Sequence, residues 1–255
     1  EIYGATFEFL NDVLPQLNVE SVFVNCWKKA DLLAEIEKGV SVLYLETPTN
    51  PLLRVADIEP LARAAHNKGA VVMLDSTFAS PVNQHPIDLG VDIVIHSATK
   101  YLGGHNDLLA GVVAGPAEVV QPIRAAAGVL GGVIDAHAAY LLLRGIKTLG
   151  IRMERHNQNG LHVARWLEAH PKVQKVWYPG LESHPDYAVA TRLMRGFAGV
   201  VTFTIASDLE GTIRFTIGDT VYDLSPGDSI HFKSTVKHRM ENPGSEPALF
   251  FCVLT

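Results

Sequence analysis

The sequence has little of several features that mark particular protein classes. Only two of its 255 residues are cysteines, and Cys26 and Cys252 lie almost the whole chain apart without a C-x-x-C motif. This usage predicts a reducing, cytoplasmic environment. Lysine and arginine form no block, and the formal net charge of −6 argues against nucleic acid or an anionic membrane as partner. No apolar run reaches the ~20 residues of a membrane span, because Asp135 and His137 interrupt the longest candidate, residues 128–143.

The start and the composition of the sequence set further expectations. The sequence begins at Glu1 rather than Met and shows no signal peptide, so we expect that an N-terminal part is missing. With 47% hydrophobic residues, the chain is rich enough in apolar side chains for one large or two modest domains, and its composition excludes disorder.

Residues 1–150 alternate short apolar runs with stretches of helical spacing. Continuous apolar runs are typical of strands buried on both faces of a sheet. The predicted strands are residues 21–25, 40–46, 70–75 and 91–96. The predicted helices cover residues 30–38 and a stretch from a capping Asp57 to Lys68. This order predicts an α/β fold, a mostly parallel sheet with helices on both faces.

The rest of the chain changes its pattern twice. Residues 117–170 are rich in helix, with Asp135 as a predicted cap, and predicted strands 173–178 and 199–205 belong to a smaller α+β segment. Residues 211–224 alternate strictly around Gly218-Asp219, which predicts a β-hairpin. We therefore predict three parts: a partial cofactor-binding α/β domain (1–150), the start of a small α+β domain (151–206) and a β-rich tail (207–255).

Polar side chains follow three of the predicted parallel strands, where open α/β sheets collect their chemistry. These ends read Glu46-Thr47-Pro48-Thr49-Asn50-Pro51, Asp75-Ser76-Thr77 and Ser97-Ala98-Thr99-Lys100. A lysine behind a buried strand loses hydration, which lowers its pKa and suits an amine nucleophile. Ser97 and Thr99 offer hydroxyls to a phosphate, and Asp75 needs a cationic partner such as a protonated pyridine nitrogen. Together these groups predict a pyridoxal phosphate site.

Each of these residues also has an ordinary interpretation. Lys100 alone is more often a solvated end of a strand, Asp75 a helix cap, and Ser97 and Thr99 loop hydroxyls that bind backbone. Residues 97–100 also match the S-x-x-K pattern of penicillin-binding enzymes, but the chain has neither S-D-N nor K-T-G. The conjunction of all four groups favours the cofactor site.

Several segments resemble, in order and spacing, the Cys/Met-metabolism (transsulfuration) family of fold-type I pyridoxal phosphate enzymes. The resemblance covers about residues 1–205 and is nearest to cystathionine γ-synthase and the γ-lyases. The segments that carry it are Tyr3–Thr6 (YGAT), Leu45–Pro51 (LETPTNP), Asp75–Pro81 (DSTFASP), His96–Leu102 (HSATKYL), Gly103–Gly111 (GGHNDLLAG), Gly131–Leu149 and Tyr178–Leu181.

The resemblance implies a role for each candidate residue. Lys100 would form the imine with pyridoxal phosphate and move protons, Asp75 would hold the ring nitrogen, and Ser97 and Thr99 would hold the phosphate. Tyr3 would stack on the ring and assist proton transfer, and Asn50 would contact the ring hydroxyl. The implied reaction is γ-elimination or γ-replacement on sulfur amino acids or activated homoserine. It also implies a homo-oligomer, because the family's active sites form between subunits.

The chain also departs from this family at both ends. It begins after the family's phosphate-binding N-terminal arm and Ser-Gly-Met turn, and the family's carboxylate-gripping arginine is absent after about Ile205, so we expect an impaired site. Residues 208–255 instead resemble the second half of a cupin barrel, with Gly227, His238 and Asn242 in motif spacing. Because His231 is the only other possible ligand, we predict no metal. We expect a fusion near residues 205–209, with the tail strands docked on strand 199–205.

Two alternatives to the enzyme remain at this stage. The first is a non-catalytic binding or scaffold protein whose cupin-like tail binds a ligand and whose α/β part is only a support. The second is a decayed gene product that does not fold.

Overall fold

The structure, a computed structural model, describes residues 2–25, 27–205, 213–217, 219–224 and 238–241. The chain divides into two compact units, Glu1–Ala164 with Trp177–Thr202, and Arg165–Val176 with Phe203–Thr255. The candidate residues all lie in the first unit. Our division into three parts stays a prediction.

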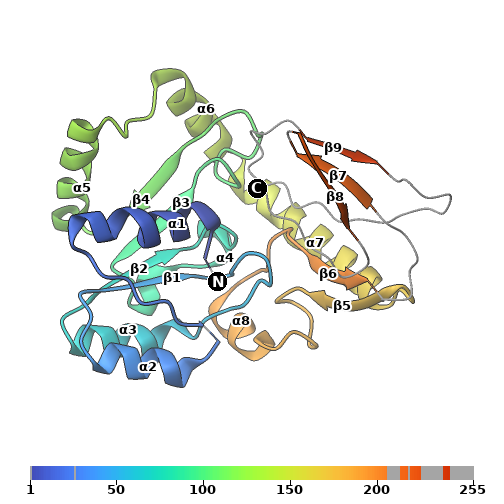
Figure 1. Cartoon of the computed structure of the whole chain (residues 1–255), viewed down its shortest axis with the longest axis horizontal. Helices are drawn as coiled ribbons and strands as arrows, with labels where there is room; N and C mark the ends of the chain where they lie inside the picture. Colours follow the sequence, from blue (N-terminus) through green and yellow to red (C-terminus); the bar gives the residue numbers. More distant parts are fainter. Residues whose placement is uncertain (1, 26, 206–212, 218, 225–237, 242–255) are drawn as a thin grey trace. The chain divides into compact units, whose positions relative to one another are not determined.

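A four-stranded sheet organises the first unit (Figure 1). It contains β1 (Val42–Glu46), β2 (Val71–Asp75), β3 (Ile93–Ser97) and β4 (Gly111–Ala114) in this order. β1, β2 and β3 run parallel, and β4 is antiparallel to β3. The mostly parallel sheet is therefore confirmed, and the three continuous apolar runs form strands close to their predicted ranges.

The fourth predicted strand, residues 21–25, is wrong. The segment is irregular and pairs with none of the described strands, and Val22 is 63% exposed. An apolar run forms a stable strand only when a neighbour satisfies its backbone groups, and here none does.

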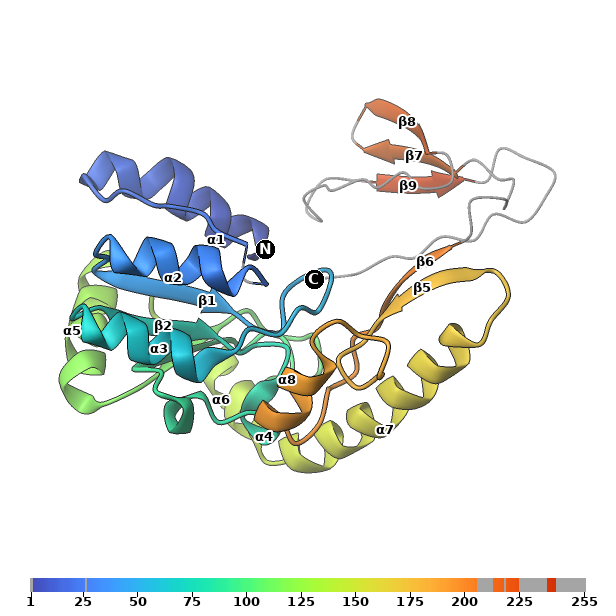
Figure 2. The same cartoon turned by 90° about the horizontal axis from the view of Figure 1, so that it is seen from below.

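Helices α2 (Lys29–Glu37) and α3 (Ile58–Asn67) cover one face of β1 and β2 (Figures 1 and 2). Both helices were predicted. The predicted cap at the start of α3 is wrong: the Asp57 side chain makes no cap bond, because it is drawn to Lys29 Nζ at 2.9 Å and to Arg192.

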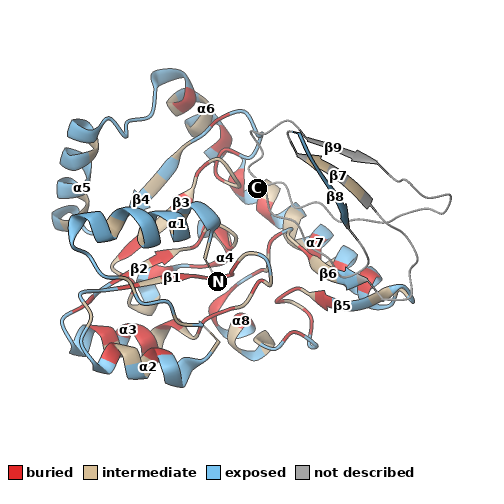
Figure 3. Ribbon diagram, viewed as in Figure 1, coloured by how far each residue is buried: buried red, intermediate tan, exposed pale blue. Residues whose placement is uncertain are grey.

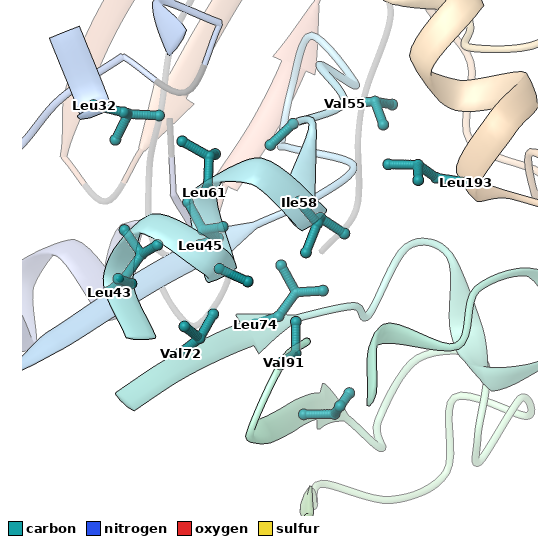
Figure 4. Close-up of a cluster of buried hydrophobic side chains, with 14 of the residues drawn as sticks. Leu32, Leu43, Leu45, Val55, Ile58, Leu61, Val72, Leu74, Val91 and Leu193 are labelled. Atoms are coloured by element: carbon teal, nitrogen blue, oxygen red, sulfur yellow. The ribbon is translucent and has the colours of Figure 1, made fainter. Parts of the chain in front are cut away.

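A cluster of buried aliphatic side chains joins these helices to the sheet (Figure 4). Leu43, Leu45, Val72 and Leu74 from the strands meet Ile58 and Leu61 of α3, and each of the six is at most 7% exposed. Each fully buried Leu or Ile contributes on the order of 1.5–3 kcal/mol. The cluster packs β1 and β2 against α3 and so fixes the strands whose carboxyl ends carry candidate residues.

The remaining helices of the first unit flank the sheet. Their bounds are α1 (Gly4–Glu8), the π-helix η1 (Phe9–Val13), the 3₁₀-helices η2 (Leu14–Leu17) and η3 (Pro86–Leu89), α4 (Ser80–Asn83), α5 (Ala117–Leu130), α6 (Ala136–Ile146), α7 (Leu149–Glu168), which continues into the second unit, and α8 (Tyr187–Leu193). Asp135 caps α6 as predicted, accepting N–H bonds from His137 at 2.9 Å and Ala138 at 3.0 Å. α1 and α5 are largely exposed (Figure 3).

The second unit contains two small sheets. β5 (Val173–Trp177) pairs with β6 (Thr202–Ile205), and β7 (Ile213–Ile217) pairs antiparallel with both β8 (Thr220–Leu224) and β9 (His238–Glu241). The predicted hairpin is confirmed by β7 and β8, although Gly218 of its turn lies outside the described residues. Within the described ranges, β6 pairs with β5 and with no tail strand, so the expected strand docking is not seen.

Candidate functional site

The predicted strand ends meet at one edge of the sheet. Glu46 and Asp75 are direct register partners, and Asp75 in turn is paired with Ile95 of β3. Because β1, β2 and β3 are parallel and adjacent, the polar segments that follow them converge as the sequence predicted.

Asp75 is fixed through one of its two oxygens. Its Oδ1 accepts hydrogen bonds from the backbone N–H and the hydroxyl of Thr77, while the Thr77 hydroxyl oxygen accepts the N–H of Ser97 at 2.8 Å. Within the described part of the chain, Asp75 Oδ2 has no hydrogen-bond partner. Half-buried and unpaired, Oδ2 is suited to accept an N–H from a cationic ring.

Lys100 is half-buried in the turn that follows β3. Its N–H donates to the Ser97 carbonyl at 3.1 Å, and its carbonyl accepts the Gly104 N–H at 2.8 Å. These two backbone hydrogen bonds fix the turn before and after Lys100. Burial lowers the pKa of the Lys100 amine. No carboxylate in the described ranges forms an ion pair with it. Desolvation without a counter-charge favours the neutral, nucleophilic amine.

The loop behind Lys100 is built from close backbone contacts. A side chain at Gly103 would meet the Ala98 carbonyl oxygen at 2.9 Å, and Gly104 has φ +75° with the Arg152 guanidinium packed on it. That guanidinium donates to the carbonyls of Tyr101 and Gly145, each at 2.8 Å. The glycine pair and Arg152 therefore fix the path of the chain directly after the lysine.

The two proposed phosphate hydroxyls differ in their surroundings. Ser97 is half-buried and, in the described ranges, its hydroxyl makes no hydrogen bond. Thr99 Oγ1 accepts the Ala110 N–H at 3.1 Å and lies 3.5 Å from the Ala110 carbonyl oxygen. Ser97 is thus open to a ligand, whereas Thr99 is also used to hold the chain that leads into β4.

Tyr3 and Asn50 meet at Glu46. Glu46 is 8% exposed and accepts the Tyr3 N–H at 2.7 Å and the Asn50 N–H at 3.1 Å. Burial, together with the negative charge of Asp75, raises the pKa of Glu46 to about 7, although the two N–H bonds lower it. The Tyr3 side chain is 47% exposed.

The structure brings all six predicted residues into one connected set. Glu46 links Tyr3 to Asn50 and pairs with Asp75, Thr77 links Asp75 to Ser97, and the turn from Ser97 carries Thr99 and Lys100. The sequence did not assign roles to Glu46 or Thr77, although both were noted as strand-end residues. Only their contacts with distant backbone groups identify them.

The fold and the arrangement of these groups are typical of the fold-type I class of pyridoxal phosphate-dependent enzymes: an open, mostly parallel sheet, a half-buried lysine after one strand and an acid at the end of the neighbouring strand. The chain belongs to the Cys/Met metabolism PLP-dependent enzyme family, whose model matches residues 1–224. A cupin domain model matches residues 209–254, so this tail is similar to cupins. The sequence-based resemblances are confirmed.

The chain is similar to enzymes of sulfur amino-acid metabolism. It is 45% identical to cystathionine gamma-synthase 1, chloroplastic, of Nicotiana tabacum over 216 residues, which are 84% of this chain and 40% of that protein. It is 41% identical to cystathionine gamma-lyase of Bacillus subtilis, over 82% of this chain and 55% of that protein. The crystal structure of cystathionine gamma-lyase from Lactobacillus plantarum complexed with L-serine superposes with a TM-score of 0.78 at 38% identity, covering 81% of this chain and 54% of that one.

The chain spans about half the length of the curated relatives it matches. These similarities do not favour the scaffold alternative. No group of metal-binding side chains occurs among the residues that the structure describes, and no described helix is long and apolar enough to cross a bilayer. Gly227 and Asn242 of the cupin-like motif, and His231, the other possible metal ligand, lie outside the described residues.

Proposed function

We propose that this chain binds pyridoxal phosphate and acts on sulfur amino acids or activated homoserine, by γ-elimination or γ-replacement. The proposed cofactor residues are Lys100, Asp75, Ser97, Thr99, Asn50 and Tyr3, and the catalytic ones are Lys100 and Tyr3. The observation that carries the proposal is the half-buried Lys100 amine, which has no ion-pair partner among the described residues and lies in the turn after β3, the strand adjacent to the one that ends in Asp75.

The chain's own groups fit this cofactor. Asp75 Oδ2 would hold the ring nitrogen and keep it protonated, while Thr77 fixes the other oxygen of the same carboxylate. The open hydroxyl of Ser97 would donate to the phosphate, and Thr99 would add a second hydroxyl from the same turn. Tyr3 would stack on the ring, and the Asn50 side chain would contact the ring hydroxyl.

Proton movement falls to two residues. When bound, pyridoxal phosphate supplies an electron-withdrawing ring that acidifies the substrate Cα–H and Cβ–H and so permits departure of the γ-substituent. Burial lowers the pKa of Lys100 and so favours the neutral amine, whose Nζ would accept the Cα proton and return it later. The Tyr3 phenol would assist that proton transfer.

Trapping the cofactor on Lys100 tests the proposal. Borohydride treatment of the full chain with pyridoxal phosphate should attach a phosphopyridoxyl group to Lys100, detected by peptide mass spectrometry. Lys100→Ala should lose both the adduct and the yellow colour, whereas the exposed-lysine control Lys147→Ala should retain them. Oxoacid release from cystathionine would then report elimination, and formation of cystathionine from an acylated homoserine and cysteine would report replacement. A colourless wild-type protein without the adduct would exclude the proposal.

We further propose that the chain forms a homo-oligomer, with a small amino-acid substrate and no nucleic acid or membrane as partner. The support is a stretch of exposed apolar side chains in and around α5 and α6: Leu109, Val129, Leu130, Val133, Tyr140, Leu143 and Ile151, each at least 63% exposed. Apolar surface of this kind marks interaction sites. The net charge of −6 and the two separated cysteines support a cytoplasmic location without a nucleic-acid partner.

A further inference from the structure

One buried acid at the edge of the sheet has no role in the proposed chemistry. Glu46 uses each of its two carboxylate oxygens for a different backbone segment: Oε2 accepts the N–H of Tyr3, 43 residues away, and Oε1 accepts the N–H of Asn50. Tyr3 is the last residue before α1, and Asn50 lies in the loop after β1. One side chain thus ties two otherwise separate segments to the strand end.

We propose that Glu46 is a positioning residue whose ionised carboxylate holds the backbones of Tyr3 and Asn50, and that its protonation releases one of them. The inference rests on the proposed function for its purpose, since Tyr3 and Asn50 are the residues assigned to the cofactor ring. It does not rest on that function for its test, because both hydrogen bonds join groups of the chain itself.

The charge state of Glu46 decides how many N–H groups its carboxyl can accept. An ionised carboxylate accepts at both oxygens, whereas a protonated one carries a hydroxyl that donates and opposes one of the two N–H groups. A matched N–H bond to a charged acceptor is among the stronger hydrogen bonds of a protein. Losing it frees the Tyr3 or the Asn50 segment.

The surroundings of Glu46 place this change near neutral pH. Asp75 faces it from β2, the Tyr44 phenol faces it from its own strand, and the N-terminal segment contributes the Tyr3 backbone. Burial first, and then the charge of Asp75, raise the pKa of Glu46 to about 7, against the N–H bonds of Tyr3 and Asn50 and the positive charge of the terminal amino group, which lower it. The pKa of Tyr44 is raised by its own burial and by the two acids, so this phenol stays neutral. The bridge is therefore complete above about pH 7 and weakened below it.

Amide hydrogen exchange of the full chain, read by NMR without and with pyridoxal phosphate, tests the inference. Corrected for intrinsic exchange, protection of the Tyr3 or Asn50 amide should fall about tenfold from pH 8 to pH 5.5, with a midpoint near 7. The side chain of Glu46→Gln has one acceptor oxygen and one donor group, so either the Tyr3 or the Asn50 amide should be unprotected at every pH. The exposed-acid control Glu118→Gln should behave as the wild type.

A second measurement follows the cofactor. The affinity of the wild type for pyridoxal phosphate should show an acid limb with the same midpoint, and Glu46→Gln should bind about tenfold more weakly without that limb. Equal protection of both amides in Glu46→Gln overturns the inference. Wild-type protection that does not change between pH 5.5 and 8 overturns it as well, and this second measurement does not need a folded variant. Failure of the proposed function shows separately, as a wild-type protein with a pH-dependent bridge but no Lys100 adduct.

Discussion

At the residue scale, the proposed site depends on side chains that hold the candidate residues in place, mostly through backbone N–H groups. The rule that chemistry collects behind parallel strands was enough to predict Lys100, Asp75 and Ser97 from the sequence. It was not enough for Thr77 or Glu46, because each acts on a backbone N–H that is distant in sequence: Ser97 for Thr77, and Tyr3 for Glu46. A local pattern contains no information about such a partner until the fold is known.

Thr77 gives the residue-scale prediction. Thr77→Val removes the hydroxyl that donates to Asp75 and accepts the Ser97 N–H, leaving that half-buried N–H unpaired and one bond fewer on the acid. We expect a loss of about 1–2 kcal/mol in the free energy of unfolding, measured by urea denaturation. The affinity for pyridoxal phosphate, measured by fluorescence titration, should fall about tenfold. Thr77→Ser keeps the hydroxyl and should bind pyridoxal phosphate like the wild type. A Thr77→Val variant that binds pyridoxal phosphate equally well would contradict this role of the hydroxyl.

At the element scale, the sequence located most helices and strands but not every detail of their ends. The apolar runs before Glu46, Asp75 and Ser97 became strands because each has a neighbour, whereas residues 21–25 have a similar pattern but pair with no strand in the described part of the chain. Asp57 and Asp135 both precede helices, yet only Asp135 caps one. Arg192, far along the chain, and Lys29 compete for Asp57, and neither competitor is visible in the local sequence.

The cap of α6 gives the element-scale prediction. Asp135→Ala leaves the His137 and Ala138 N–H groups without their acceptor, and we expect the thermal midpoint to fall by a few degrees. Asp135→Asn retains an acceptor oxygen and should stay near the wild type. Hydrogen bonds from Ala138 and His137 lower the pKa of Asp135, so its contribution is present above the usual aspartate range and is lost as pH falls through the lowered pKa. An Ala variant that melts like the wild type at pH 7 would show that the cap is dispensable.

At the scale of the whole molecule, the sequence predicted two kinds of structure, and both are present: a mostly parallel sheet in the first unit and an antiparallel hairpin in the tail. It did not predict how the tail strands pair. β7 joins β8 and β9, and within the described ranges none of them extends the β5–β6 sheet, because strand pairing depends on which edges meet and an alternating pattern fits many edges equally well. The same limit applies to surfaces between chains, which no periodicity in α5 or α6 identifies.

Self-association is therefore best tested by placing charged side chains at the exposed apolar positions. Leu130 and Leu143 are 85% and 66% exposed, so they add little to the fold of a single chain but would be buried in an oligomer. We expect the wild type to sediment as a dimer or larger assembly at micromolar concentration, and the double variant Leu130→Glu with Leu143→Glu to sediment as a monomer with an unchanged circular dichroism spectrum. Leu17→Glu changes a 65% exposed leucine outside this stretch and should leave the assembly intact. A monomeric wild type, or an assembly insensitive to two charges at these positions, would assign the apolar residues around α5 and α6 to something other than a second copy of this chain.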